Sequence, residues 1–258
     1  MSLHIENLSF AYYPGRPVLR GLNLEIRAGQ VTGVFGPNGS GKSTLLRCLN
    51  GALRPQAGCV LHEGQRLAAL TPREIARRIA VVPQEQETPA NAPFLVREMV
   101  MLGRFARWNF WGQESSEDHR AVHASLERVG ALELQDRHFA ELSGGERQRV
   151  IIARALAQAT RTLLLDEPAS HLDIAHQLDV FHLARALAGE VYTVLMVCHD
   201  LVLAPLFVDE AVLLKEGRIF ARGPVREVLR PEHLAACFGC ALAITWPSAG
   251  MASVVLRQ

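Results

Sequence analysis

The stretch Gly36-Pro37-Asn38-Gly39-Ser40-Gly41-Lys42-Ser43-Thr44 decides the fold of this chain. It fits the pattern G-x-x-x-x-G-K-[ST], in which a glycine-rich loop joins a strand to a helix. The run 31–35 before the loop is typical of a short buried strand, and the run 44–49 after it has apolar residues at helical spacing. We therefore predict a phosphate-binding loop (P-loop) rather than an ordinary strand-to-helix turn.

The residues of the P-loop suit a nucleoside triphosphate. Glycines let the backbone fold tightly, so that successive N–H groups point into one concavity, and the helix N-terminus adds a partial positive charge. We expect Lys42 to reach the β- and γ-phosphates and the Ser43 hydroxyl to bind Mg²⁺. The expected nucleotide-binding residues in this stretch are Gly36, Asn38, Gly39, Ser40, Gly41, Lys42, Ser43 and Thr44.

The composition bounds the class of protein. The 258 residues are 49% hydrophobic, which is enough for a substantial core, and the formal net charge of +1 gives no case for a nucleic-acid partner. The N-terminus shows no signal-peptide pattern, and no apolar run approaches the roughly 20 residues that span a bilayer. We expect a soluble cytoplasmic protein whose membrane role, if it has one, depends on a partner.

The cysteines do not predict a chemical site. There are five, and their odd number and scattered positions do not resemble a secreted disulfide framework. Cys237 and Cys240 form a C-x-x-C pattern, but the sequence offers no further ligands for zinc and no partner for redox chemistry. We expect buried, inert thiols.

The first 35 residues alternate and turn like an antiparallel β layer, with Leu8, Phe10 and Tyr12 on one face of a strand. An aromatic side chain near the P-loop could stack on a purine base. Its spacing from Leu8 favours Tyr12, whereas closeness to the turn at Pro14 favours Tyr13, so both are candidates. The alternative is a core tyrosine with a hydrogen-bonded hydroxyl.

The segment after the P-loop helix predicts three short elements and one functional side chain. Residues 58–64 fit a hairpin, Thr71 and Glu74 fit a capping box at a helix start, and residues 79–82 form a β-type run. Gln84 follows that run. Beside a P-loop, its amide oxygen is suited to Mg²⁺ or to the attacking water, although a glutamine at a strand end can also be simply solvated.

The middle of the chain predicts an all-α insertion, because residues 94–160 contain no convincing β run. A helix is expected over 94–104, a basic and aromatic loop over 104–112, and a helix capped by Ser116 that runs to about Val129. Exposed aromatic side chains in such a loop mark a protein contact, but they could also pack inside the insertion. The aromatic residues are Phe105, Trp108, Phe110 and Trp111.

The next helix starts with two glycines that a simple cap does not explain. Ser143 and Glu146 fit a capping box, yet Gly144 and Gly145 then occupy the first turn, where each costs up to about 1 kcal/mol relative to alanine. Glycines leave the backbone N–H groups bare at the positive end of the helix dipole. We therefore predict an anion site at this helix start.

Two buried strands end in polar side chains. Residues 163–165 lead into Asp166 and Glu167, and residues 192–198 lead into His199. Ligands of open α/β sheets bind at the carboxyl ends of the strands. We expect Asp166 near Mg²⁺, usually through water, Glu167 as general base or as the group that polarises the attacking water, and His199 hydrogen-bonded to the γ-phosphate.

The last part of the chain predicts structure only. Residues 211–214 and 218–221 fit a hairpin, residues 224–238 fit a helix, and a strand and tail follow.

With these motifs in place, nearly the whole chain resembles the ATPase subunit of an ATP-binding cassette (ABC) transporter. By the family pattern, residues 36–44 are the Walker A motif, Gln84 the Q-loop, 142–146 the signature, 163–167 the Walker B motif, 170–173 the D-loop and His199 the switch histidine. The resemblance makes the nucleotide ATP and adds Asp173 to the expected nucleotide-binding residues. Ala169 and Cys198 depart mildly from the pattern, and neither is a ligand.

The resemblance also implies a fold and partners. It implies a P-loop NTPase with a RecA-like core and an antiparallel β subdomain, as one ABC domain over 1–258, with the core at 1–85 and 161–258 and a helical subdomain at about 86–160. Two copies would sandwich two ATP molecules between the P-loop of one chain and the signature of the other. A membrane-spanning permease would hold the subunit at the cytoplasmic side of the membrane, and a substrate-binding protein would act indirectly.

The cargo class is predicted from two further stretches. Residues 118–122 and 172–178 are similar to those of the metal-chelate importers, which carry ferric siderophores, haem or cobalamin. A molybdate or tungstate importer of the same architecture also fits the motifs. Outside transport, a soluble ABC-type ATPase with a different kind of partner fits them too. A nucleotide-gated binding module without turnover conflicts with the intact Glu167.

Overall fold

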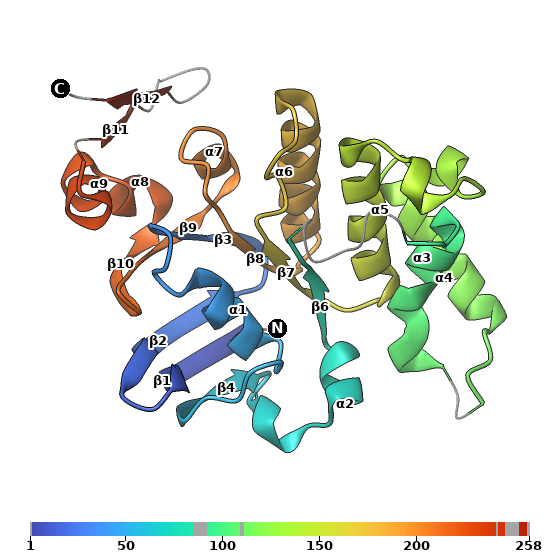
Figure 1. The fold of residues 1–258 in the computed structure, drawn as a ribbon, viewed down its shortest axis with the longest axis horizontal. Coiled ribbons are helices and arrows are strands. Elements are labelled where there is room, and N and C mark those ends of the chain that lie inside the picture. The colour runs from blue at the N-terminus through green and yellow to red at the C-terminus, as the bar shows by residue number, and fades with distance from the viewer. Residues whose placement is uncertain (1, 85–91, 109–110, 241, 246–252, 257–258) are drawn as a thin grey trace.

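The computed structural model describes residues 2–84, 92–108, 111–240, 242–245 and 253–256. Within these ranges the chain builds two main sheets, helices that cover them, and a separate group of helices at one side (Figure 1).

The first sheet is the predicted antiparallel layer, in the strand order β2-β1-β4-β5. Every second residue of β2 from Leu22 to Ile26 is buried, as expected for a sheet with one face on the core. The predicted hairpin is confirmed and turns at Glu63 and Gly64. The strands are β1 (Ser2–Tyr13), β2 (Arg16–Arg27), β4 (Ala57–His62) and β5 (Gln65–Arg66).

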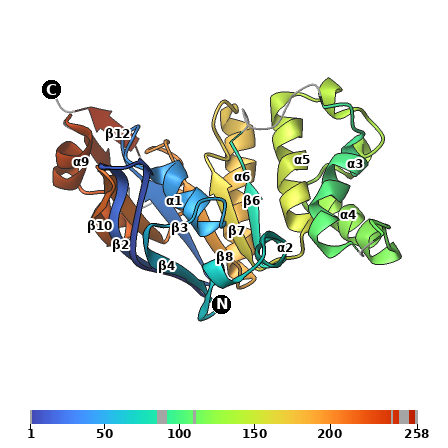
Figure 2. The same ribbon diagram turned by 60° about the horizontal axis from the view of Figure 1, so that its bottom comes forward.

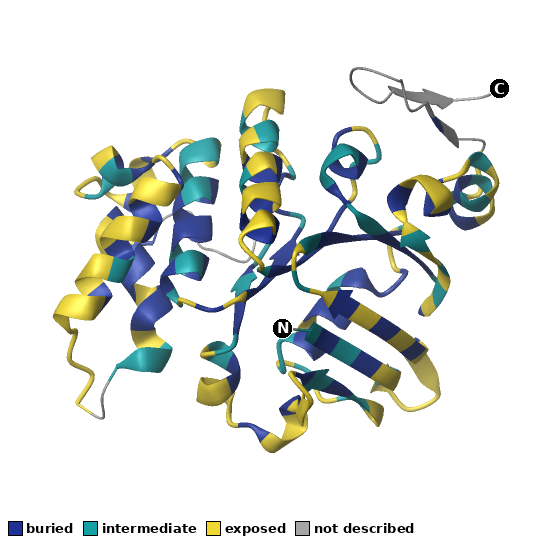
Figure 3. Ribbon diagram, turned by 180° about the vertical axis from the view of Figure 1, so that it is seen from behind, coloured by how far each residue is buried: buried dark blue, intermediate teal, exposed yellow. Residues whose placement is uncertain are grey.

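The second sheet has six strands in the order β10-β9-β3-β8-β7-β6. All of its neighbouring pairs are parallel except the β9–β10 hairpin, which is antiparallel and was predicted. Figure 3 shows that this sheet is largely buried. Its strands are β3 (Gln30–Phe35), β6 (Ile79–Val82), β7 (Thr162–Asp166), β8 (Thr193–Val197), β9 (Glu210–Lys215) and β10 (Arg218–Pro224).

Alternate residues of the parallel strands enter two different cores. Leu164 and Leu195 pack with the helix α1 (Lys42–Leu49) and the antiparallel layer. Leu163, Leu165 and Met196 pack on the opposite side with the helix α6 (Ile174–Gly189). The continuous apolar runs of β7 and β8 are therefore strands that are buried on both faces, as is typical of a parallel sheet.

The predicted insertion is helical and lies beside the parallel sheet (Figure 2). It contains α3 (Val96–Met101), α4 (Ser116–Arg128) and α5 (Gly144–Ala157). Two predicted bounds are wrong. The helix expected from Phe94 starts at Val96 and tightens to a 3₁₀ helix over Leu102–Arg107. The cap of α4 is Ser115, not Ser116, because Ser115 Oγ accepts the backbone N–H of Asp118.

The residues 104–112 are not simply a loop, because Arg104 belongs to the 3₁₀ helix and is only 2% exposed. Its Nε donates to Asp118 Oδ1 at 2.6 Å, and its Nη1 donates to the carbonyl oxygen of Ala157 at 2.9 Å. A basic side chain that the sequence places in an exposed loop is thus sealed inside the helical group, where it joins three segments.

The predicted C-terminal helix is two helices, α8 (Val225–Val228) and α9 (Pro231–Phe238). Pro231 stands at the first position of α9 and cannot continue a preceding helix, which explains the break. Strands β11 (Leu242–Thr245) and β12 (Ser253–Leu256) pair beyond it. Short helices α2 (Pro72–Ala76) and α7 (Ala204–Phe207) complete the set, and the capping box of α2 is confirmed.

Two remaining expectations can be compared with the structure. Cys48, Cys198 and Cys237 are buried, but Cys240 is exposed, so the expectation of buried thiols is wrong for that residue. Among the described residues, no helix is long and apolar enough to cross a bilayer.

Candidate functional site

The sheet order brings the predicted motifs to one edge. The strands β3, β8, β7 and β6 are neighbours, and the P-loop, His199, Glu167 and Gln84 follow their carboxyl ends. The loops are joined by backbone bonds, because Cys198 donates to Val34 O at 3.0 Å and Glu167 donates to Val197 O at 3.1 Å. A polar cluster therefore forms where an open α/β sheet binds its ligands.

The P-loop glycines are required by the backbone. Gly39 and Gly41 have φ values of 78° and 105°, in the left-handed region that side chains disfavour. A Cβ atom on Gly36 would lie 2.1 Å from the carbonyl oxygen of Leu214. The loop can close tightly only with glycine at these positions, as the sequence predicts.

Two buried polar side chains of the P-loop suit a phosphate. Lys42 Nζ donates to the carbonyl oxygens of Gly36 at 2.8 Å and Pro37 at 3.1 Å, so the ammonium lies in the concavity of the loop. Burial lowers the pKa of Lys42, while Glu167 and Asp166 act in the opposite direction. Ser40 Oγ is buried without a hydrogen-bond partner. A phosphate oxygen would satisfy both groups.

Glu167 is at the centre of the polar cluster. Gln84 Nε2 donates to its Oε2 at 3.1 Å, and His199 Nε2 contacts its Oε1. Its backbone has φ +50°, which is uncommon and strained for a residue other than glycine. The structure thus brings together Gln84, Glu167 and His199, which come from three separate segments of the chain.

The candidate metal ligands fit a hard divalent cation. Ser43 offers a hydroxyl, Gln84 an amide oxygen and Asp166 a carboxylate, which are the oxygen donors that Mg²⁺ prefers. Asp166 is only 6% exposed and ends the buried strand β7. Ser43 lies in the first turn of α1, Gln84 follows β6 and Asp166 ends β7, and these elements meet at the same sheet edge.

Of the two candidate tyrosines, Tyr12 has contacts that lead to the P-loop helix. Its hydroxyl lies 3.4 Å from Thr44 Oγ1, and its ring packs edge-on against Phe10 with the centroids 5.0 Å apart. Tyr12 is 48% exposed and Tyr13 is 71% exposed. The face of Tyr12 is therefore open beside the loop, which favours it for stacking on a base.

The predicted anion site lies on a different part of the molecule. The capping box is confirmed, because Ser143 N and Oγ both donate to Glu146 Oε2 at 2.8 Å. These bonds lower the pKa of Glu146. The helix α5 that carries Ser143, Gly144 and Gly145 lies on the far side of α6 from the P-loop helix α1 (Figures 1 and 2). One chain does not bring the signature to its own P-loop.

Asp173 caps α6 and leads to a residue that the sequence analysis did not single out. Its Oδ1 accepts the backbone N–H of His176 at 3.0 Å and lies 2.8 Å from His176 Nδ1. The i, i+3 spacing of Asp173 and His176 at a helix start was the available signal.

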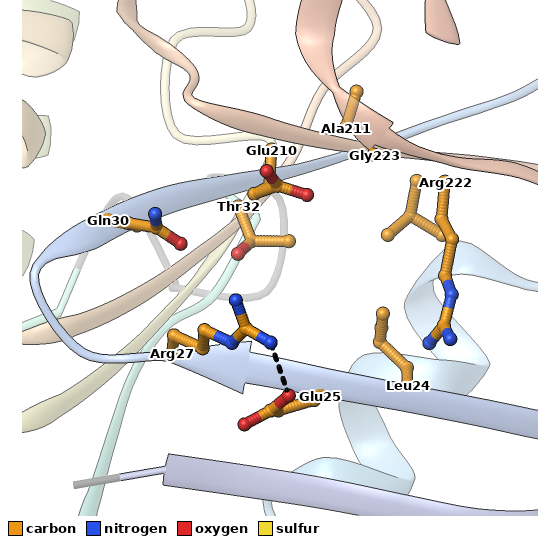
Figure 4. A pocket seen from close by; sticks show the side chains of 10 residues that line it. Leu24, Glu25, Arg27, Gln30, Thr32, Glu210, Ala211, Arg222 and Gly223 are labelled. Carbon is orange, nitrogen blue, oxygen red and sulfur yellow. Dashed lines mark hydrogen bonds and ion pairs between the residues drawn. The ribbon is translucent and has the colours of Figure 1, made fainter.

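A pocket between the two sheets lies at the opposite end of β3 from the P-loop (Figure 4). Arg27 pairs with Glu25 at 2.9 Å inside it and also faces Glu210, while Thr32 points into the same space. Its charges are compensated within the chain, and none of the predicted motifs reaches it.

Comparisons with known proteins agree on the family. A family model described as ABC transporter matches residues 19–170. The hemin import ATP-binding protein of Rhizobium meliloti is 42% identical, over 95% of this chain and 94% of that protein. The iron(3+)-hydroxamate import ATP-binding protein of Bacillus subtilis is 40% identical, over 92% of this chain and 87% of that protein.

Solved structures give the same result. A protein assigned to the metal-chelate type of ABC transporter, in an inward-facing conformation, has 30% identity, covers 100% of this chain and 98% of its own, and gives a TM-score of 0.85. A dimeric cassette bound to ADP and Pi has 27% identity, covers 87% of this chain and 99% of its own, and gives a TM-score of 0.74.

Proposed function

This chain belongs to the ABC transporter ATPase family, and from that premise we propose how its residues divide the work of the site. The protein is an ATP-hydrolysing subunit of an importer and acts with a membrane permease. The observation that carries the proposal is the meeting of the P-loop, Asp166, Glu167, His199 and Gln84 at one edge of the parallel sheet.

We assign the chemistry of hydrolysis to Glu167. Its carboxylate would accept a proton from the attacking water or polarise it, once the water takes a place beside the γ-phosphate. Gln84 and His199 already hold both of its oxygens, so they can orient the carboxylate and the water. Mg²⁺, held by Ser43, Gln84 and Asp166, would neutralise charge on the phosphate oxygens. Lys42 and backbone N–H groups of the P-loop would hold the phosphates.

We propose that the site is completed by a second copy of the chain. Charge that develops on the γ-phosphoryl group needs donors beyond those of the P-loop, and the Ser143 hydroxyl with the N–H groups of Gly144 and Gly145 can supply them. Because α5 lies away from α1 in the same chain, these donors would come from the partner copy. Tyr12 would stack on the adenine, and Asp173 would lie near the dimer interface.

For the cargo we propose a metal chelate. The similar proteins named above import hemin and iron(3+)-hydroxamate, and a third, from Halobacterium salinarum, imports cobalamin and is 41% identical over 93% of this chain and 60% of that protein. These cargoes share a metal ion in a large organic chelator. Molybdate or tungstate would be a different class of cargo, an oxyanion, and none of these three relatives is named for it.

The permease would dock on the helical group. A surface there is lined by Phe94, Met101, Leu102 and Trp108, and the ring of Phe105 packs against Trp108 with the centroids 5.5 Å apart. Phe105 and Trp111 are 69% and 79% exposed. Phe110 is outside the described residues. Exposed aromatic side chains of this kind favour a protein contact. Docked in this way, the subunit would sit at the cytoplasmic face of the membrane, and a substrate-binding protein would deliver cargo on the other side.

The test is uptake by the reconstituted complex with its permease. We expect Mg-ATP to drive uptake of a ferric siderophore, haem or cobalamin, and the Lys42→Ala subunit to drive none, because the charge on the phosphates is lost. Radioactive molybdate is the competing cargo. ATP-driven molybdate uptake without uptake of any chelate would overturn the cargo proposal, and unchanged hydrolysis in Lys42→Ala would overturn the site.

A further inference from the structure

The first turns of α5 and α6 touch through one side chain, His176. A Cβ atom on Gly145 would lie 2.5 Å from Cδ2 and 2.7 Å from Nε2 of the His176 ring. A real Cβ atom does not come this close to its neighbours, so with any other residue at position 145 the imidazole or the α5 backbone would have to move. Gly145 is therefore constrained within its own chain, besides any role of its N–H group toward an anion.

The imidazole is held in place from the other side. Its Nδ1 lies 2.8 Å from Asp173 Oδ1, which also accepts the His176 backbone N–H at 3.0 Å. These two bonds to His176 lower the pKa of Asp173, so the cap is a carboxylate at neutral pH. With Nδ1 engaged, the opposite edge of the ring, Cδ2 and Nε2, is the edge that meets Gly145.

The same turn of α6 also holds the D-loop. Gln177 Nε2 donates to the carbonyl oxygens of Ala169 at 3.2 Å and Leu172 at 3.1 Å. Farther along the two helices, a hollow lined by Arg149, Asp179 and Leu183 lies between the helical group and α6. The contact at the helix starts is thus placed where it can join the signature to the D-loop.

We propose that His176 is a positioning residue for ATP hydrolysis. It fixes the signature glycines relative to the D-loop of the same chain, so that both are presented to the second copy as one surface. This inference rests on the proposed role of Ser143, Gly144 and Gly145 as donors to a nucleotide bound by that copy. The carboxylate of Asp173 orients the ring, and the ring edge orients α5.

Two substitutions separate the two contacts of the ring. His176→Ala removes both. His176→Asn keeps an N–H donor near the position of Nδ1 and can still bond Asp173, but it lacks the ring edge that meets Gly145. The matched control is His182→Ala, farther along the same helix. The ring of His182 packs on Phe207 with the centroids 4.9 Å apart, and His182 also lines the hollow between α6 and the helical group.

The measurements are kcat for ATP hydrolysis and the dissociation constant of ATP for the full-length subunit. If the signature donors Ser143, Gly144 and Gly145 are displaced, the rate of hydrolysis falls while ATP still binds to the P-loop. We therefore expect kcat to fall at least about tenfold in both His176 variants. The dissociation constant should stay within about twofold of the wild-type value, and His182→Ala should leave kcat unchanged. A merely structural histidine would lower the melting temperature in His176→Ala without this split.

The outcomes distinguish the inference from the function on which it rests. Ser143→Arg blocks the signature directly and should abolish hydrolysis. Loss in Ser143→Arg with a kcat of His176→Asn within twofold of wild type would overturn the role of His176 alone. Normal hydrolysis in Ser143→Arg would overturn the signature assignment itself. Parallel losses of kcat and ATP affinity in His176→Asn would also overturn the inference, because they would mean damage to the chain's own P-loop.

Discussion

The pairs Arg104–Asp118 and His199–Glu167 both join separate chain segments through a carboxylate, but they differ in burial and in what surrounds them. The side chains of Arg104 and Asp118 are 2% and 6% exposed, and those of His199 and Glu167 are 43% and 10% exposed. Arg104 also donates to a backbone carbonyl of α5, whereas the second partner of Glu167 is another side chain, Gln84.

The difference indicates that Arg104–Asp118 is a structural pair, whereas His199–Glu167, which we call the working pair, serves the proposed site. The pair Arg104–Asp118, which we call the sealed pair, is buried in the helical group and has further partners in the Ala157 carbonyl and the Ser115 cap. Removing one member therefore leaves the other as an unpaired buried charge. The pair at the sheet edge is open on one side, and Glu167 has a strained backbone. We therefore expect a water molecule and a phosphate to replace these partners without unfolding the chain.

The largest expected effect is on the working pair. Glu167→Gln is nearly isosteric but cannot accept a proton, so we expect ATP binding to persist and hydrolysis to fall by about 10²–10⁴-fold. Steady-state hydrolysis and equilibrium ATP binding measure the two quantities. The variant should also accumulate as an ATP-bound dimer in light scattering. Hydrolysis within tenfold of wild type would mean that another group is the base.

The next effect is on the sealed pair. Arg104→Met leaves Asp118 buried without its cation, which we expect to lower the free energy of unfolding by about 3–5 kcal/mol. The double variant Arg104→Met/Asp118→Asn should recover part of this loss, because the uncompensated charge is gone. Chemical denaturation measures both. His199→Ala, at the exposed pair, should cost less than about 1 kcal/mol, and equal losses at the two pairs would contradict the comparison.

Acid should weaken the pair Arg104–Asp118 only at low pH. Burial raises the pKa of Asp118, but hydrogen bonds from Ser115 and Arg104 outweigh it and hold the pKa below the ordinary value of 3.8. A lowered folded pKa gives a stabilisation that is complete above the unfolded pKa and is lost as the pH falls through the folded one. The difference in unfolding free energy between wild type and Asp118→Asn should therefore be constant above about pH 5 and shrink below about pH 4. A difference that stays constant down to about pH 2 would be inconsistent with this pair.

The smallest effect on stability is expected at the aromatic surface. Trp111 is 79% exposed, while Trp108 packs against the core and its carbonyl accepts from Arg73. Trp111→Ser should change the unfolding free energy by less than about 0.5 kcal/mol and still uncouple transport from hydrolysis. Trp108→Ser should destabilise the helical group. Coupled transport in Trp111→Ser would exclude that side chain from the permease contact.

The sequence predicted the parts of this structure whose pattern is local. The P-loop, the capping boxes of α2 and α5, and the apolar strands β7 and β8 each follow from residues within one short stretch. The strands also determined which polar residues meet at the sheet edge, because carboxyl ends of parallel neighbours coincide. Asp166, Glu167 and His199 therefore stood in the expected place.

What the sequence could not predict depends on contacts between distant segments. Arg104 reads as an exposed loop residue because its partners, Asp118 and Ala157, are 14 and 53 residues away. The sequence predicts only an anion-binding role for Gly145, because its contact with the ring of His176 joins two positions that are distant in the sequence. The sequence analysis predicts one helix over residues 224–238, and the break at Pro231 is found only in the structure.

The most direct measurement tests whether one chain holds a whole active site. Lys42→Ala and Ser143→Arg are each expected to be inactive as homodimers. In a mixture, one site of the heterodimer joins an intact P-loop to an intact signature, so we predict partial recovery of ATP hydrolysis and ATP-dependent formation of the heterodimer. No recovery, with heterodimers that form equally well without ATP, would contradict the account.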